Sequence, residues 1–205
     1  MNLYLIRHGE PAIPEGHVQN DFPLSEKGHS QASALSERMR MVSIDHLFSS
    51  PLIRARQTAD WVNRPRDLPI RLEEAFQEMN LGEMAGMSRQ EIFKRYGDYL
   101  NSRPTPLMEY GYVHGESPAQ FHNRVTQAFE KHIWTPFSKS QANVALVAHG
   151  GVICVILLHF LGLVFDGYLT FLVDFTGISQ IDTRHGRPRI RTVNDLNHLR
   201  EANLL

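Results

Sequence analysis

Two short apolar runs, each ending in a histidine and a glycine, constrain the fold of this chain more than any other feature. The first run covers residues 3–6 and leads into Arg-His-Gly at 7–9, and the second covers residues 143–148 and leads into His-Gly-Gly at 149–151. Each run has the length of one buried strand. Open α/β sheets bind ligands at the carboxyl ends of such strands, so two histidines are predicted to meet at one sheet edge. For either run alone, the alternative is a strand followed by a solvated turn.

Predicted strands alternate with predicted helices over most of the chain. Strands at 46–49 and 70–72 lie between the two runs, and Ser25, Ser50 and Ser117 look like helix N-caps. This alternation is typical of a mainly parallel sheet with helices on both faces, which is a three-layer α/β/α sandwich. The predicted helices cover 25–40, 51–61, a short segment from 88, a segment from 117 that ends before Pro136, and 150–162.

The final third of the chain breaks this alternation. Residues 168–175, 178–183 and 189–193 have the composition of strands, and turns at 176–177 and 185–186 separate them. Because no helix lies between them, these strands are predicted to pair antiparallel at one edge of the sheet. An exposed edge strand could also pair two subunits, so a homodimer is one option.

The 205 residues are predicted to form one domain, 1–205, in which residues 76–123 are a small helical cap inserted over the strand ends. The sequence contains no repeats, no low-complexity segment and no convincing linker. Six side chains of the insertion could line an amphipathic mouth or could form the core of the cap. They are Tyr96, Tyr99, Met108, Tyr110, Tyr112 and His114.

Composition argues against several classes of function. The formal net charge is -1, so no overall field favours nucleic acids or acidic membranes, and anion binding has to come from local arginines and histidines. A single cysteine, Cys154, rules out a disulfide framework. The most apolar run, 152–165, is interrupted and is shorter than the ~20 residues of a membrane span. Since the N-terminus also lacks a signal-peptide pattern, we expect a cytoplasmic protein.

A third segment, residues 48–59, adds an arginine near the start of a predicted helix. Arg54 falls in the first turn, where the partial positive charge of the helix end already favours an anion. With this segment the chain resembles the histidine phosphatase superfamily, which includes the cofactor-dependent phosphoglycerate mutases. The resemblance rests on four motifs in family order: Arg-His-Gly at 7–9, Ser-Ser-x-x-x-Arg-Ala-x-x-Thr-Ala at 49–59, Glu78 ahead of Gly82 and Gly86, and His-Gly-Gly at 149–151.

The chemistry of phosphoryl transfer gives these residues roles. Arg7 and Arg54 can each hold two oxygens of a phosphate dianion, because a guanidinium is a planar fork. His8 is the predicted nucleophile, since a neutral imidazole can form a covalent phosphoryl intermediate and the arginines oppose its protonation. The resemblance implies that His149 binds the phosphoryl group and stabilises the transition state. Glu78 is the expected proton donor to the leaving alcohol and then the base for water.

The chain departs from the family pattern after the first motif. Many members have Thr or Ser next and a phosphate-contacting Asn three positions later, where this chain has Pro11 and Pro14. His17, on the following loop, is predicted to take over part of the anion contact. Gly150 is also predicted to bind the substrate, because a glycine lets the backbone approach a ligand closely.

These residues predict a phosphomonoester hydrolase that acts through a phosphohistidine on a small phosphorylated metabolite, without a metal or another cofactor. A phosphoglycerate mutase-type transferase is the alternative within the family, although such mutases are usually longer. A catalytically idle member that binds a phosphorylated ligand is a further alternative, but it would not need Glu78. None of the 11 histidines shows a metal-site spacing such as His-Glu-x-x-His. The sequence leaves the identity of the substrate open.

Overall fold

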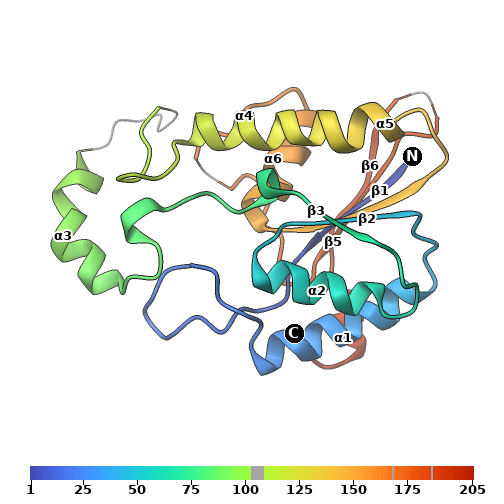
Figure 1. Cartoon of the computed structure of the whole chain (residues 1–205), viewed down its shortest axis with the longest axis horizontal. Coiled ribbons are helices and arrows are strands. Elements are labelled where there is room, and N and C mark those ends of the chain that lie inside the picture. The colour runs from blue at the N-terminus through green and yellow to red at the C-terminus, as the bar shows by residue number, and fades with distance from the viewer. Residues whose placement is uncertain (103–108, 168, 186) are drawn as a thin grey trace.

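One six-stranded sheet organises the computed structural model, which describes residues 1–102, 109–167, 169–185 and 187–205 (Figure 1). The strands follow the order β3-β2-β4-β1-β5-β6 across the sheet. All six lie where the sequence predicts strands. Their bounds are β1 Asn2–Arg7, β2 His46–Ser49, β3 Ile70–Leu72, β4 Asn143–Ala148, β5 Ile178–Asp182 and β6 Arg189–Asp195.

The parallel part of the sheet brings the two histidine-bearing strand ends together. β1 pairs with β4 in parallel, and Arg7 is the register partner of Ala148. His8 and His149 therefore leave neighbouring strands at the same level. β2 lies on the other side of β4 and ends at Ser49, at the same edge of the sheet.

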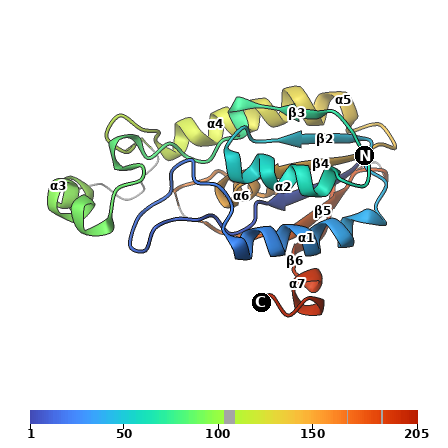
Figure 2. The same ribbon diagram turned by 60° about the horizontal axis from the view of Figure 1, so that its bottom comes forward.

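Helices cover both faces of the sheet (Figures 1 and 2). Successive residues of β1 enter two separate cores, because side chains alternate along a strand: Leu5 packs with α4 and α6, and Ile6 packs with α1 and α2. The three-layer α/β/α sandwich predicted from the sequence is confirmed. The bounds of these helices are α1 Glu26–Arg40, α2 Ile53–Asn63, α4 Pro118–Phe129 and α6 Gly150–Phe160, and the short α7 Asn197–Glu201 packs against α1.

The C-terminal edge of the sheet is antiparallel, as predicted. β5 pairs antiparallel with β1 on one side and with β6 on the other. Part of the turn predicted at 185–186 lies outside the described residues.

The prediction of a strand at 168–175 is wrong. Its first residue lies outside the described residues, and the remainder forms no strand. The backbone of this segment bonds to side chains instead of to a neighbouring strand. Val173 O accepts from Arg7 Nη1 at 2.6 Å, and the Asp174 amide donates to Asn194 Oδ1 at 2.9 Å. An apolar composition alone therefore does not make this segment part of the sheet.

Capping side chains begin three of the predicted helices. Ser25 Oγ accepts from the Gly28 amide at 3.0 Å at the start of α1. At the start of α4, Ser117 and Gln120 form a reciprocal capping box. Ser88 Oγ likewise accepts from the Glu91 amide at 3.2 Å, before the helix Arg89–Asn101, so these local signals correctly located all three helix starts.

The sequence predicts that the helix from residue 117 ends before Pro136. This prediction is wrong, because the helix that begins with α4 continues through that proline. A π-helical turn, Glu130–Trp134, carries it on into α5, Thr135–Phe137. The turn before Pro136 is the π-helical one, in which the Thr135 amide donates to Glu130 O, so the regular α-helical bonding that a proline interrupts is already broken there.

The segment that carries α3, Arg89–Asn101, extends away from the sheet (Figures 1 and 2). None of the α3 residues is buried, and Phe93 is 75% exposed. Two 3-10 turns, Glu74–Phe76 and Gly82–Met84, lie between β3 and α3. Among the helices of the described residues, none combines the length and the hydropathy that crossing a membrane requires.

Candidate active site

His8 is the buried centre of the site. Its Nδ1 lies 2.7 Å from Gly9 O. Because a carbonyl oxygen can only accept, Nδ1 carries the proton and Nε2 keeps a lone pair. Burial, followed by the positive charges of Arg54 and Arg7, lowers the pKa of His8 well below its ordinary 6.5. The ring is therefore neutral at neutral pH.

Arg54 is aimed at the free nitrogen of His8. Its Nε donates to His8 Nε2 at 3.2 Å, and its Nη1 donates to Asn20 O at 2.7 Å. The side chain is buried, and neither of these partners carries a negative charge. An anion placed at His8 Nε2 would therefore meet a desolvated guanidinium, for which charge-assisted hydrogen bonds are strong.

The helix that carries Arg54 begins two residues later than predicted. Its first residue is Ile53, and Leu52 occupies the cap position, so Ser50 is not the N-cap. No side chain at the cap position itself caps the helix. Asp21, on the loop before α1, instead accepts from the Ile53 amide at 2.7 Å.

His149 and Ser50 form a second buried pair beside His8. Ser50 Oγ lies 2.8 Å from His149 Nε2, and the ring centroids of His8 and His149 are 5.0 Å apart. Burial, followed by the neighbouring His8 ring and the positive charges of Arg54 and Arg7, lowers the pKa of His149 well below 6.5. Ser50 is not among the residues predicted for the site. The available signal was its position directly after a strand that ends beside β4.

Two buried polar atoms near His8 lack a protein partner. Arg7 Nε and His149 Nδ1 are two of four such side-chain atoms among the described residues. Leaving a buried polar atom unpaired costs roughly 1 to 3 kcal/mol, so proteins keep few of them. Arg7 is otherwise well held, since Nη1 donates to Val173 O and Cζ lies 4.2 Å from the ring centroid of Phe175. A bound oxyanion would supply the missing partners.

Glu78 approaches from the loop after β3. Its Oε2 accepts from the Gly151 amide and its Oε1 from the Met79 amide, both at 3.1 Å. Gly151 lies in the first turn of α6 and has no room for a side chain, because a Cβ there would overlap Glu78 Oε1. At Gly150 a Cβ would come no closer than 3.6 Å, to Arg7 Nε, which is an ordinary contact. The residue of this pair that must be a glycine is therefore Gly151, and the group that approaches it closely is the carboxyl group of Glu78.

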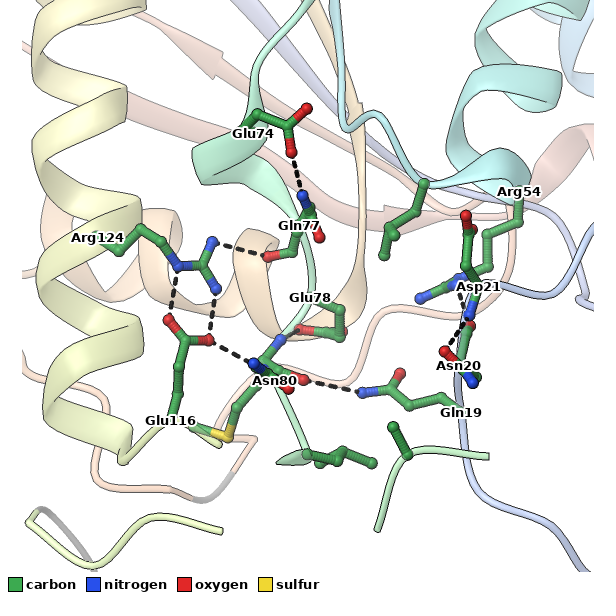
Figure 3. A pocket seen from close by; sticks show the side chains of 14 residues that line it. Gln19, Asn20, Asp21, Arg54, Glu74, Gln77, Glu78, Asn80, Glu116 and Arg124 are labelled. Carbon is green, nitrogen blue, oxygen red and sulfur yellow. Dashed lines mark hydrogen bonds and ion pairs between the residues drawn. The ribbon is translucent and has the colours of Figure 1, made fainter. Parts of the chain in front are cut away.

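An arginine of α4 holds the loop that carries Glu78 (Figure 3). Arg124 Nη1 donates to two backbone carbonyls just before Glu78, at 2.8 and 3.1 Å. Its Nε and Nη2 bind the two carboxylate oxygens of Glu116 at 2.7 and 2.6 Å, and Glu116 also accepts from the Asn80 amide. The backbone on both sides of Glu78 is therefore tied to one ion pair. Neither partner was predicted; the available signal was a charged residue between the buried apolar positions of α4.

A cavity of about 370 Å³ opens at these strand ends (Figure 3). Arg54 and Glu78 line it, and His8 lies buried in contact with Arg54. Cavities of this size hold small metabolites. Within the residues that the structure describes, no group of three or more His, Cys, Asp or Glu side chains could hold a metal ion.

His17, predicted to contact the anion, makes other contacts. Its Nδ1 lies 2.9 Å from Glu15 O, and its backbone bridges to Ser88. It is not among the residues that line the cavity. The structure thus brings together six of the predicted site residues and leaves His17 aside; the six are Arg7, His8, Arg54, Glu78, His149 and Gly150.

Two tyrosines of the segment 76–123 bond within that segment. Tyr96 donates to Glu83 at 2.6 Å, and Tyr99 donates to Gly111 O at 2.7 Å. None of the described tyrosines lines the cavity. Met108 lies outside the described residues.

Comparison with known proteins adds an independent finding. The model of the histidine phosphatase superfamily (branch 1) matches residues 3–196. This chain belongs to the histidine phosphatase superfamily. A Schizosaccharomyces pombe protein named as a probable phosphatase is 30% identical over 97% of this chain and 95% of its own length. An Erwinia tasmaniensis protein named as a probable phosphoglycerate mutase is 24% identical over 100% of this chain and 97% of its own length.

A solved structure gives the same result for the fold. The crystal structure of the alpha-ribazole phosphatase from Shigella flexneri has a TM-score of 0.83 and 26% sequence identity, and the match covers 95% of this chain and 96% of that one. The resemblance to the histidine phosphatase superfamily that four motifs indicated is therefore confirmed. Similarity to proteins named as phosphatases supports phosphatase activity, and it does not identify the substrate.

Proposed function

We propose that this chain hydrolyses phosphomonoesters of small metabolites through a phosphohistidine at His8, without a metal ion. The observation that carries the proposal is the contact of Arg54 Nε with the unprotonated Nε2 of His8. A neutral imidazole beside a buried cation can attack the phosphorus of an anion that the same cation holds. The unpaired Arg7 Nε and His149 Nδ1 provide further contacts for the transferring phosphoryl group.

In the first step, the lone pair of His8 Nε2 attacks phosphorus opposite the leaving oxygen. The N–P bond forms as the P–O ester bond breaks, and Arg7, Arg54 and His149 stabilise the charge on the phosphoryl oxygens. Glu78 gives a proton to the leaving alkoxide. The hydrogen bond from Nδ1 to the backbone holds the ring and supports the positive charge that it acquires.

In the second step, water hydrolyses the phosphohistidine. The ionised Glu78 takes a proton from water, the water oxygen attacks phosphorus, and the N–P bond breaks. Inorganic phosphate leaves, and His8 Nε2 recovers its lone pair. Glu78 suits both steps because it is half-buried and lines the cavity, where alcohol and water enter. We also propose that residues 76–123 act as a cap of a single domain, since this segment supplies Glu78.

A mutase would return the phosphoryl group to a bound product instead of to water. Chain length does not distinguish the two, because this chain covers 97% of the relative named as a probable phosphoglycerate mutase. The position of Glu78 on the wall of a cavity favours hydrolysis, since water can reach the intermediate there. Product analysis with 3-phosphoglycerate and a bisphosphate primer separates hydrolysis from transfer.

Trapping the intermediate tests the proposed function. After a brief incubation with a phosphoryl-labelled aryl phosphate and an acid-free quench, the protein should carry label that acid removes and alkali preserves, as a phosphoramidate does. His8→Ala should abolish both label and turnover, because the nucleophile is gone. His185→Ala, at an exposed turn after β5, is the matched control and should keep both.

The same assay is run with EDTA, which should change neither result because Arg7 and Arg54 supply the positive charge. Loss of most activity on chelation, restored by a divalent ion, would contradict the metal-independent mechanism. A folded His8→Ala protein that turns over at nearly the wild-type rate would rule out the phosphohistidine.

A further inference from the structure

The wall of the cavity that Arg54 and Glu78 line carries more negative than positive charge (Figure 3). The described residues that line it include four carboxyl groups and two guanidinium groups. The carboxyl groups belong to Asp21, Glu74, Glu78 and Glu116, and the guanidinium groups to Arg54 and Arg124. Even with Glu78 protonated as the acid, carboxylates outnumber guanidiniums. The other polar lining residues are all carboxamides.

Both arginines of the wall already have partners. Arg54 contacts His8 and Asn20 O, and in the proposed function it holds the phosphoryl group. Arg124 binds both oxygens of Glu116 and two backbone carbonyls. A second anionic group on a substrate would therefore find neither arginine free.

Among the described residues, two of the carboxylates form no salt bridge, although the charge of Asp21 interacts with that of the nearby Arg54. Asp21 accepts from the Ile53 amide, and Glu74 accepts from the side-chain amide of Gln77. Both side chains belong to exposed residues at the cavity. They present negative charge to the part of the substrate that lies beyond its phosphate.

We propose that this wall selects phosphate esters of alcohols whose other groups are neutral or cationic, and disfavours esters that carry a second carboxylate or phosphate. The proposal rests on the proposed function, because it concerns the leaving group of that reaction. Carboxylates and carboxamides can bond to the hydroxyl and ammonium groups of such alcohols. A second anion would instead face like charge without a partner, which costs free energy even near a protein surface.

Two pairs of substrates that differ by one carboxylate test the proposal. Glycerol 3-phosphate is compared with 3-phosphoglycerate, and phosphoethanolamine with phosphoserine, at low salt. The kcat/KM value should favour the carboxylate-free member of each pair by about tenfold or more, and added salt should reduce that preference by screening. Equal values at low salt, a preference for the acidic members, or a preference that salt leaves unchanged would overturn the proposal.

Charge changes on the wall give a second test. Glu74→Lys should shift both ratios toward the acidic members by about tenfold, and Glu74→Gln by about threefold. Glu37→Lys makes the same charge change on α1, where Glu37 pairs with Arg40 and does not line the cavity, so its ratios should stay at wild-type values. Unchanged ratios in folded Glu74→Lys and Glu74→Gln proteins would overturn the proposal.

Failure of the proposed function would look different from failure of this selectivity. In that case no phosphomonoester would be hydrolysed, an aryl phosphate included. The dissociation constants of the same four esters, measured calorimetrically with the wild-type chain at low salt, then decide. Tighter binding of the carboxylate-free members supports the charge selection, and equal or weaker binding overturns it.

Discussion

The two sides of the candidate site are built differently. On the phosphoryl side, His8, Arg54 and His149 are buried, and each follows a strand or lies in the first turn of a helix. On the leaving-group side, Glu78 is half-buried on a loop, and the backbone before it is held by Arg124. The register of the sheet positions the first side, and an ion pair between side chains positions the second.

This difference separates two parts of the reaction. Every phosphomonoester presents the same phosphoryl oxygens to the buried side. The alcohol, which differs between substrates, meets the loop side. Changes on the buried side should therefore slow all esters alike, whereas changes on the loop side should slow esters according to how much protonation the leaving group needs.

Among the changes that compare the two sides, Arg54→Ala should have the largest effect and should act on aryl and alkyl phosphates. We expect turnover to fall about 100- to 1000-fold for aryl and alkyl phosphates alike, the usual loss for one group that stabilises transition-state charge. Lysine at this position should restore only part of the rate, because an ammonium lacks the planar fork. Arg56→Ala, on the exposed face of α2, is the control and should keep wild-type rates. A loss confined to alkyl phosphates would break the comparison.

The buried side is also the side that the sequence predicts well. Apolar runs that end in glycine locate His8 and His149, and the alternation of strands and helices gives the three layers. These signals are local, because burial imposes a period on each strand and helix separately. The contact of Glu78 with Gly151 joins residues 73 positions apart, and no periodicity encodes it. Only the resemblance to the family indicated a role for that carboxyl.

Glu78→Gln should affect the two substrate types unequally. Turnover of alkyl phosphates should fall about 100-fold, and that of aryl phosphates less than about fivefold, because an aryl leaving group needs little protonation. Glu83→Gln is the matched control on the same loop; Glu83 bonds to Tyr96 and His114 and should not affect either rate. Equal slowing of both substrates by Glu78→Gln would place the acid elsewhere.

The two adjacent glycines at the start of α6 lie against different sides of the site. Gly150 is next to Arg7 on the phosphoryl side, and Gly151 contacts Glu78 on the leaving-group side. Gly151→Ala should slow alkyl phosphates about tenfold more than aryl phosphates, because the new Cβ would displace the Glu78 carboxyl from the leaving oxygen. Gly150→Ala should have a much smaller effect, since its Cβ would lie 3.6 Å from Arg7 Nε. The measurement is the alkyl-to-aryl rate ratio, with circular dichroism to check the fold. A ratio that stays at the wild-type value in Gly151→Ala would contradict this role of the glycine.

Two of the errors made from the sequence concern hydrogen bonds between distant segments. Residues 169–175 have the composition of a strand, yet their backbone bonds to the side chains of Arg7 and Asn194. Ser50 has the identity of an N-cap, yet Asp21 from another loop caps the helix. Short polar side chains have several alternative backbone partners, and the tertiary structure decides among them.

Arg124→Met should have the smallest effect, and it tests whether an ion pair really positions the loop side. The change keeps an unbranched apolar stem but removes the bonds to Glu116 and to the two carbonyls before Glu78. Turnover of alkyl phosphates should fall about fivefold to tenfold and that of aryl phosphates less than about twofold, because Glu78 loses its position while the buried side stays intact. Since Arg124→Met leaves Glu116 unpaired, adding Glu116→Gln should recover stability without recovering alkyl turnover. If the double variant regained the wild-type alkyl-to-aryl ratio, the ion pair would serve only the stability of the fold, and the loop side would be positioned by the amide of Gly151 alone.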